Sequence, residues 1–184
     1  MLNRLETELG RKTFQFVAKH LQKYDAPAWR LLEHLVLSVD TMPADKRLTH
    51  AGLCVSAPGD AHSRIYLNES AEGLIPTLCH EFAHSLQVLL IADKQFVYPS
   101  VLRRGASPDL PAELLHQYSI EAAADAQCCL WGLQEPLNRA NNCRRHNPVT
   151  ATVPTLEERQ ILMQCREDLE SVLELAPLEP SETI

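Results

Sequence analysis

Two histidines and a glutamate near the middle of the chain have the types and the spacing of a catalytic metal site. The segment His80-Glu81-Phe82-Ala83-His84 matches the pattern H-E-x-x-H. Side chains four positions apart on an α-helix project from the same face, so the two imidazoles can bind one ion. Glu81 then stands beside the ion, where its carboxylate can take a proton from water without being a ligand. The pattern predicts a zinc site, with Glu81 as the catalytic base.

A third ligand must come from elsewhere, because catalytic zinc normally has three protein ligands and one open position. The candidate is Glu121, which lies inside a later segment with helical spacing. Asp125 is four positions further on and therefore shares the face of Glu121. Ligating histidines usually donate their second ring N–H to a carboxylate or a carbonyl. We therefore expect Asp125 to accept a hydrogen bond from a ligating histidine, with His80 as the preferred partner.

H-E-x-x-H followed by E-x-x-x-D on a later helix resembles the gluzincin metallopeptidases. The short spacing between the two motifs is most similar to the minigluzincins, single-domain zinc peptidases of minimal size. This resemblance covers about residues 50–133. It implies a zincin-like catalytic domain, a Zn²⁺ cofactor and the hydrolysis of peptide bonds within a peptide or protein substrate. It also implies that the extended substrate pairs with an edge strand, which here corresponds to the segment from Ser63 to Asn68.

One part of the gluzincin pattern has no motif in this sequence. Members of the group usually carry a His, Tyr or Arg side chain that stabilises the oxyanion. His116, Tyr118 and Tyr98 are the candidates, and the sequence leaves the choice among them open.

Other functions are compatible with the same residues. ImmA/IrrE-type regulators also resemble this sequence, since they carry H-E-x-x-H and a downstream Glu on a compact helical domain and act on one dedicated repressor. A binding module with little turnover is a further alternative. A latent enzyme is another, with residues 155–184 covering the cleft. A general peptidase should cut unfolded casein, whereas a dedicated regulator should not.

Single residues of the motifs also have plain structural interpretations. Glu121 alone could be a solvated helix residue, and Asp125 alone a surface charge. Cys79 falls on the core side of its helix and is expected to be a buried thiol. Cys143 and His146 match C-x-x-H without a second pair, which is a weak signal for a structural zinc site.

Hydrophobic spacing and turn signals predict the elements that position these residues. Helices are predicted over residues 2–24, 28–38, 71–91, 111–133 and 155–175, and two strands over 52–56 and 63–68 form an antiparallel hairpin. Residues 93–110 and 138–154 are expected to be irregular. Ser70 is the expected N-cap of the motif helix, and Thr155 with Glu158 the expected capping box of the last helix.

On the motif helix, a helical wheel places the two histidines opposite the apolar stripe, so they should face a cleft. Helices packed around a small antiparallel sheet predict an α+β fold. The 184 residues suit a single domain, with N-terminal helices over residues 1–40, the core described above and a C-terminal helix.

Composition excludes several classes of partner and location. The net charge is −7 and Lys and Arg are not clustered, which argues against nucleic acid as the main partner. The longest apolar run is too short to span a bilayer, and the N-terminus lacks the apolar core of a secretory signal, so no membrane is expected. Six scattered cysteines form no disulfide framework, which favours a reducing, cytoplasmic location. The oligomeric state and the substrate sequence remain open.

Overall fold

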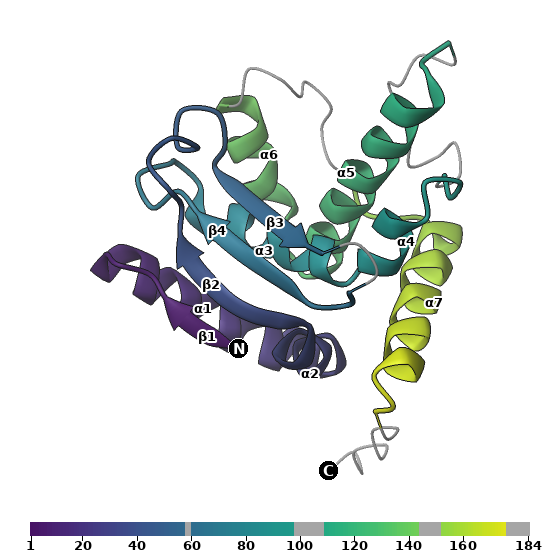
Figure 1. Ribbon diagram of the computed structural model, residues 1–184, viewed down its shortest axis with the longest axis horizontal. Helices are drawn as coiled ribbons and strands as arrows, with labels where there is room; N and C mark the ends of the chain where they lie inside the picture. Colours follow the sequence, from purple (N-terminus) through teal and green to yellow (C-terminus); the bar gives the residue numbers. More distant parts are fainter. Residues whose placement is uncertain (58–59, 98–108, 144–151, 176–184) are drawn as a thin grey trace.

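The computed structural model describes residues 1–57, 60–97, 109–143 and 152–175. Within these residues the chain forms four strands and seven helices (Figure 1). In chain order they are β1 Leu2–Arg4, α1 Glu8–Tyr24, α2 Ala26–Leu35, β2 Val36–Thr41, β3 Gly52–Ser56, β4 Ser63–Leu67, α3 Leu74–Ser85, α4 Val88–Ala92, α5 Ala112–Leu130, α6 Gln134–Cys143 and α7 Leu156–Val172. The predicted α+β class is confirmed.

The four strands form one mixed sheet in the order β1-β2-β4-β3. The predicted antiparallel hairpin of β3 and β4 is confirmed, whereas the prediction that the whole sheet is antiparallel is wrong. β2 pairs in parallel with both β1 and β4, because a helix or a long connection separates each pair in the chain. β4 therefore lies inside the sheet, and β3 lies at its edge.

Two segments predicted as the ends of helices are strands. Leu2 continues the helical spacing of the following residues, but α1 begins only after Thr7, whose side chain accepts a hydrogen bond from the backbone N–H of Gly10 (2.9 Å). The predicted second helix includes residues 36–38, yet α2 ends at Leu35 and the chain continues as β2. This segment has β-branched valines that suit a half-buried sheet.

The helix that carries the motif is shorter than predicted. α3 begins after Gly73, whose backbone is left-handed (φ 72°), and Ser70 is not its N-cap. The hydroxyl of Ser70 instead donates to Oδ1 of Asn68 (2.7 Å). The helical backbone is interrupted at residues 86–87 before the short helix α4.

The other helix predictions agree with the structure to different degrees. The helix predicted over 111–133 is present as α5, and the capping box of Thr155 and Glu158 at the start of α7 is confirmed. Part of the segment predicted to be irregular is helical, because α6 occupies residues 134–143. Of the predicted loop over 93–110, the described residues 93–97 and 109–110 are not helical, and the rest lies outside the described residues.

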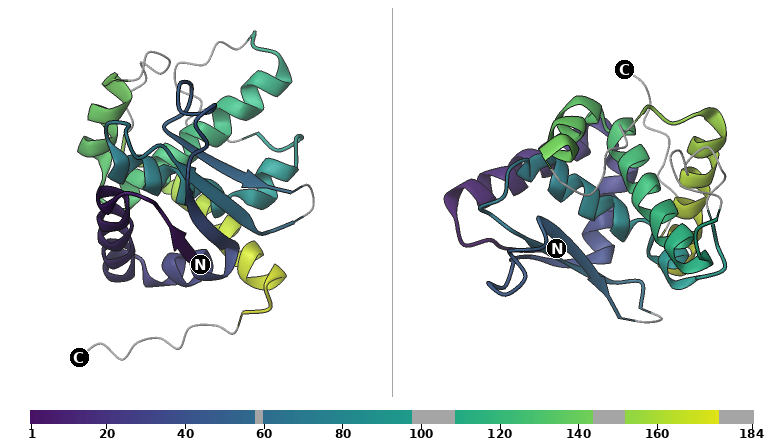
Figure 2. Two further views of the ribbon diagram at one scale, coloured as in Figure 1. Left: turned by 60° about the vertical axis from the view of Figure 1, so that its left-hand side comes forward. Right: turned by 90° about the horizontal axis from the view of Figure 1, so that it is seen from above.

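The helices gather on one face of the sheet (Figure 2). α3 lies between the sheet on one side and α5 on the other, and every residue from Pro76 to Ser85 is buried. A single apolar cluster extends from Leu5 in the N-terminal segment to Leu169 in α7. The first helices and the last helix therefore share one core with the segment that carries the motif.

Candidate metal centre

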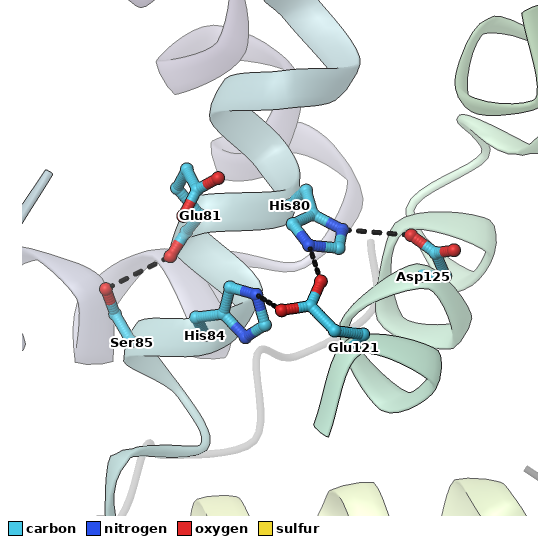
Figure 3. Close-up of polar contacts among 6 residues, drawn as sticks. All are labelled: His80, Glu81, His84, Ser85, Glu121 and Asp125. Atoms are coloured by element: carbon cyan, nitrogen blue, oxygen red, sulfur yellow. Dashed lines mark hydrogen bonds and ion pairs between the residues drawn. The ribbon is translucent and has the colours of Figure 1, made fainter. Parts of the chain in front are cut away.

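Two adjacent stripes of side chains on α3 face different neighbours. His80 and His84 are four positions apart and point towards α5, as Figure 3 shows. Glu81 and Ser85 form the next stripe, which lies on the other side of the histidines from Glu121 and faces the sheet. The i, i+4 spacing thus divides the motif into a pair that meets α5 and a glutamate that meets the hairpin.

Three side chains converge between α3 and α5. Nε2 of His80 lies 3.0 Å from one carboxylate oxygen of Glu121, and Nε2 of His84 lies 3.5 Å from the other. One potential ligand atom from each of the three residues lies within 4.8 Å of the other two. Two imidazoles and a carboxylate are the donor set of a catalytic zinc site with a fourth position left open. The structure thus brings together the three residues that the sequence predicted as ligands.

Asp125 lies behind the first histidine. Its Oδ1 is 2.9 Å from Nδ1 of His80, at the opposite edge of the ring from Glu121. An ionised carboxylate can only accept, so Nδ1 of His80 donates to Asp125, and without a metal Nε2 donates to Glu121 in the same way. If a metal replaced the proton on Nε2, the bond from Nδ1 to Asp125 would remain. Asp125 is itself 8% exposed, and small residues around it, Ala123, Ala124 and Ala126, are buried where α5 approaches α3.

The electrostatics of the cluster are set by two carboxylates and two imidazoles, of which His80, His84 and Asp125 are buried and Glu121 is partly open to the cleft, with its side chain 48% exposed. Burial alone would lower the pKa of His80, but hydrogen bonds to Asp125 and Glu121 outweigh it and raise that pKa well above its ordinary value. For Glu121 burial alone would raise the pKa, whereas its contacts with His80 and His84 lower it far below the usual range. A metal bound by these three side chains would have to displace protons held in this way, so its affinity would depend on pH.

The second histidine is supported differently from the first. Nδ1 of His84 is buried and has no hydrogen-bond partner among the described residues. The two rings stand almost perpendicular, at 89°, with centroids 4.6 Å apart. Of the two histidines, His80 therefore has its ring oriented by Asp125 as well as by Glu121, whereas the described residues hold His84 only through its contact with Glu121 and through packing.

Glu81 is 7% exposed and is not a member of the ligand group. Its side chain lies against the backbone of Gly52 in β3, and it lines the same cleft as the two histidines. This position beside the ligands, and not among them, is what a proton acceptor requires.

The ligand group lies at the floor of a cleft with a volume of about 1360 Å³. One wall is the segment 48–54, which comprises the end of the loop before β3 and the first part of that strand. The opposite wall comes from α5 and from the end of α4, and consists of Ile91, Lys94, Gln95, Ala112, Glu113, His116, Gln117 and Ile120. Apart from His116, these wall residues could not be identified from the sequence, because they belong to no motif.

The loop that forms the first wall is held by Asn68, the residue that follows β4. Its side-chain amide donates to the carbonyl oxygens of Arg47 (3.0 Å) and His50 (3.3 Å). Its backbone N–H donates to the carbonyl oxygen of Ala51 (2.8 Å). Leu48 in the same loop is 94% exposed at the cleft. Asn68 therefore sets the position of a wall that it does not line.

The expected substrate-binding segment needs a correction. The resemblance implies that the segment from Ser63 to Asn68 is an open edge, but β4 is paired on both sides, with β2 and with β3. Its backbone groups are already used in the sheet and cannot accept another strand. Among the described strands, β3 is the one beside the cleft that has a free edge.

The candidates for an oxyanion donor are placed differently. His116 lines the cleft, and its Nδ1–H donates to the carbonyl oxygen of Phe96 (2.6 Å). Tyr118 is not among the residues that line the cleft, and its pKa is raised, first by burial and then by the charge of Asp125. Tyr98 lies outside the described residues.

Three further expectations concern the surroundings of the site. Cys79 is fully buried, as expected, and burial raises its pKa. His146 lies outside the described residues, so the C-x-x-H signal stays a prediction. None of the described residues of the C-terminal segment lines the cleft, so the described part of residues 155–184 gives no support to the alternative of a latent enzyme. α7 packs instead against α2, α4 and α5.

Comparisons of the chain with protein-family models, with curated proteins and with solved structures find no match. In the part of the chain that the structure describes, no helix combines the length and apolar character needed to cross a membrane.

Proposed function

We propose that this protein is a zinc-dependent metalloendopeptidase, with His80, His84 and Glu121 as ligands and Glu81 as general base. The proposal is carried by one observation, the convergence of the two imidazoles and the carboxylate at the floor of a large cleft. The gluzincin-like motif order and the contact of Asp125 with His80 support it. When bound, zinc lowers the pKa of a coordinated water and polarises a carbonyl group.

The residues of the chain would act as follows. Glu81 accepts a proton from the attacking water at its carboxylate and passes it to the amine that leaves. Asp125 holds the proton on Nδ1 of His80 and so fixes the orientation of the ring. His116 presents an imidazole from the opposite wall, with its ring oriented by the carbonyl of Phe96. Because its Nδ1–H is used by Phe96, it would donate to the oxyanion through a protonated Nε2, and it is the described candidate best placed to do so.

An extended substrate would bind along β3. The N–H of Asn68 bonds to the carbonyl oxygen of Ala51, and the next residues in register are Gly52 and Leu67. Hydrogen-bonded and non-hydrogen-bonded residue pairs alternate along an antiparallel ladder. Ala51 and Asn68 form a hydrogen-bonded pair, so Gly52 with Leu67 and Cys54 with Ile65 are non-hydrogen-bonded pairs. The N–H and C=O groups of Gly52 and Cys54 therefore point away from β4. These free groups face the cleft side of the strand and can pair with the main chain of a peptide.

The first test is metal content. Purified protein should contain about one zinc per chain, and His84→Ala should lose most of it, because two ligands bind zinc much more weakly than three. Glu72→Gln, at an exposed carboxylate just before α3, is the control and should keep the wild-type content. Equal zinc content in wild type and His84→Ala, measured by elemental analysis, would exclude this metal site.

The second test measures zinc content and casein hydrolysis together. Zinc content distinguishes the proposed base from the proposed ligands, and casein hydrolysis distinguishes a general peptidase from a regulator. Glu81→Gln should keep zinc and lose hydrolysis of unfolded casein by about 100-fold or more, whereas Glu121→Ala should lose zinc as well. Equal loss of metal in both variants would show that Glu81 is a ligand or a structural residue. Zinc-loaded wild type that leaves casein intact would instead favour a regulator of the ImmA/IrrE type or a binding module.

A further inference from the structure

We infer that Gly52 is a positioning residue for Glu81, because the missing side chain at this point lets β3 lie directly against the carboxylate. The inference rests on the proposed function, since it concerns the base of that reaction. Gly52 has an ordinary strand conformation, so the need for glycine here comes from space and not from the backbone angles.

The approach of the strand to the carboxylate is close. A Cβ atom added to Gly52 would lie 2.6 Å from Oε1 of Glu81 and 2.7 Å from its Cγ, and 2.8 Å from a methyl group of Thr77. Separations below 3.0 Å are not tolerated by real Cβ atoms. An alanine at this position would therefore displace either the carboxylate or the strand. Thr77 is fully buried and has no room to move, and Glu81 is 7% exposed and lines the cleft, so the added Cβ would push its carboxylate out of place towards the cleft.

A second interaction fixes the strand along the same face of α3. The hydroxyl of Ser85, one turn after Glu81, lies 2.8 Å from that of Ser63 in β4 and 3.5 Å from the thiol of Cys54 in β3. Cys54 is two positions after Gly52 and so lies on the same side of the strand. The strand is thus held at Ser85 and meets Glu81 one turn earlier, and it cannot shift along α3 to relieve a clash.

The same glycine also faces the substrate side. The backbone N–H and C=O of Gly52 point away from β4, towards the open edge, and Gly52 lines the cleft. Its amide groups would therefore bind the substrate main chain while its α-carbon lies against the base. This arrangement fixes the distance between the bound peptide and the carboxylate of Glu81, and misplacement by about 1 Å can lower a catalytic rate by about 100-fold.

The kinetic test uses Gly52→Ala in the full-length, zinc-loaded protein. We expect kcat on a fluorogenic peptide to fall by about 10–100-fold, with zinc content unchanged because the proposed ligands lie on the neighbouring stripe of α3 and on α5. Val55→Ala is the control, since Val55 lies on the same strand, is 44% exposed and does not line the cleft. It should keep kcat within about twofold of wild type. A Gly52→Ala kcat within about twofold of wild type, or an equal fall in both variants, would overturn the inference.

A thermal-unfolding cycle tests the packing of Gly52 against Glu81 without any catalysis. Gly52→Ala should lower the melting temperature by about 5 °C through overpacking, and by less than half of that in a Glu81→Ala background, where the two closest contacts are gone and only the contact with Thr77 remains. Equal shifts in both backgrounds would overturn the inference. Glu81→Ala with Gly52→Ala should fold even if Gly52→Ala alone does not. If wild type shows no zinc-dependent hydrolysis, the proposed function fails and the catalytic role of Gly52 fails with it, while the cycle still reports the packing.

Discussion

At the scale of single residues, Asp125 makes one hydrogen bond that matters to the proposed site, and its strength can be measured. Asp125→Asn keeps an acceptor near Nδ1 of His80 but removes the charge that supports the imidazole. We expect zinc affinity to fall by about 10–100-fold, less than in Glu121→Ala. Zinc titration against a competing chelator measures this. Glu113→Gln, on the same helix and wall of the cleft, is the control.

The two outcomes for Asp125 have different structural meanings. A carboxylate that forms only an ordinary exposed ion pair contributes little, and its loss would be nearly silent. The loss of a carboxylate that supports a ligand should instead lower zinc affinity by about 10–100-fold. If the zinc affinity of Asp125→Asn lies within about twofold of wild type, well short of that loss, Asp125 does not contribute to the site and the three proposed ligands bind zinc without it.

The residues with motif spacing could be predicted from the sequence, because their relation is local. His80 and His84 share a helix face, and so do Glu121 and Asp125, whatever the rest of the fold. Gly52 could not be predicted, because the need for a glycine depends on which side chain lies opposite the strand. The missing partner of Nδ1 of His84 among the described residues could not be predicted either, since it depends on the packing around α3.

At the scale of elements, Glu69 joins three segments that are distant in the sequence. Its carboxylate accepts from the backbone N–H of Glu6 (3.0 Å) and of Thr7 (2.8 Å), and from the hydroxyls of Thr7 and Thr41. Gly10 allows this approach, because a Cβ there would lie 2.1 Å from Oε2 of Glu69. Glu69 thus ties the start of α1 and the end of β2 to the connection before α3.

This carboxylate makes stability depend on pH. Burial alone would raise the pKa of Glu69, but the hydrogen bonds from Thr41, Thr7 and the backbone outweigh it and lower the pKa below its usual 4.5. A group whose pKa is lower in the folded state stabilises it above the unfolded pKa, and this contribution is lost as the pH falls through the folded pKa. Glu69→Gln should therefore reduce the free energy of unfolding by about 1–3 kcal/mol at pH 7.

Urea unfolding at about pH 7 and about pH 3.5 measures this effect. The difference between wild type and Glu69→Gln should shrink at the lower pH, because pH 3.5 lies below the usual pKa of 4.5, so that the carboxyl group of the unfolded wild-type chain takes up a proton and the unfolded state gains stability. Glu72→Gln, three residues away and exposed, should show no such difference. A difference that is the same at both pH values would mean that shape, and not charge, makes Glu69 important.

The elements that the sequence predicted correctly have long, regular patterns or, like the hairpin of β3 and β4, a turn signal between them. α5 and α7 extend over several turns and carry clear start signals, whereas β1 has three residues and lies beside apolar residues with helical spacing. β2 follows α2 without a loop, so no turn signal marks the change. Its partners, Leu2 in β1 and Ser63 in β4, lie far away in the chain, and parallel pairing of this kind leaves no local pattern.

At the scale of the whole molecule, Asp25 connects the N-terminal helices with the C-terminal half. It caps α2, accepts from the indole N–H of Trp131 (2.9 Å), and binds both terminal nitrogens of Arg166 in α7 (3.1 and 2.5 Å). Both partners of this ion pair are mostly buried. α7 is therefore anchored to the molecule on the side of α2, and in the described structure it does not reach the cleft.

Removing the anchor should affect stability and leave the site intact. Arg166→Ala leaves the Asp25 carboxylate without its cation and should lower the free energy of unfolding by about 2–4 kcal/mol. Arg159→Ala, on the same helix but bonded only to the carbonyl of Pro154 among the contacts described, should cost less than about 1 kcal/mol. Zinc content and casein hydrolysis of the folded Arg166→Ala protein should equal those of wild type. A higher rate would instead support latency imposed by α7.

The order of the strands also governs self-association. Unpaired strand edges attract other chains, and short strands are one way in which proteins blunt them. Here the three exposed residues of β1 cover the far edge of β2, while no described strand pairs with the edge of β3 beside the cleft. Two molecules that paired through β3 would each block the other's cleft, so concentrated protein should lose activity before it precipitates. Loss of β1 would expose the six residues of β2 as a second unpaired strand edge. Each molecule could then pair with two others, so that dimers would grow into open-ended oligomers.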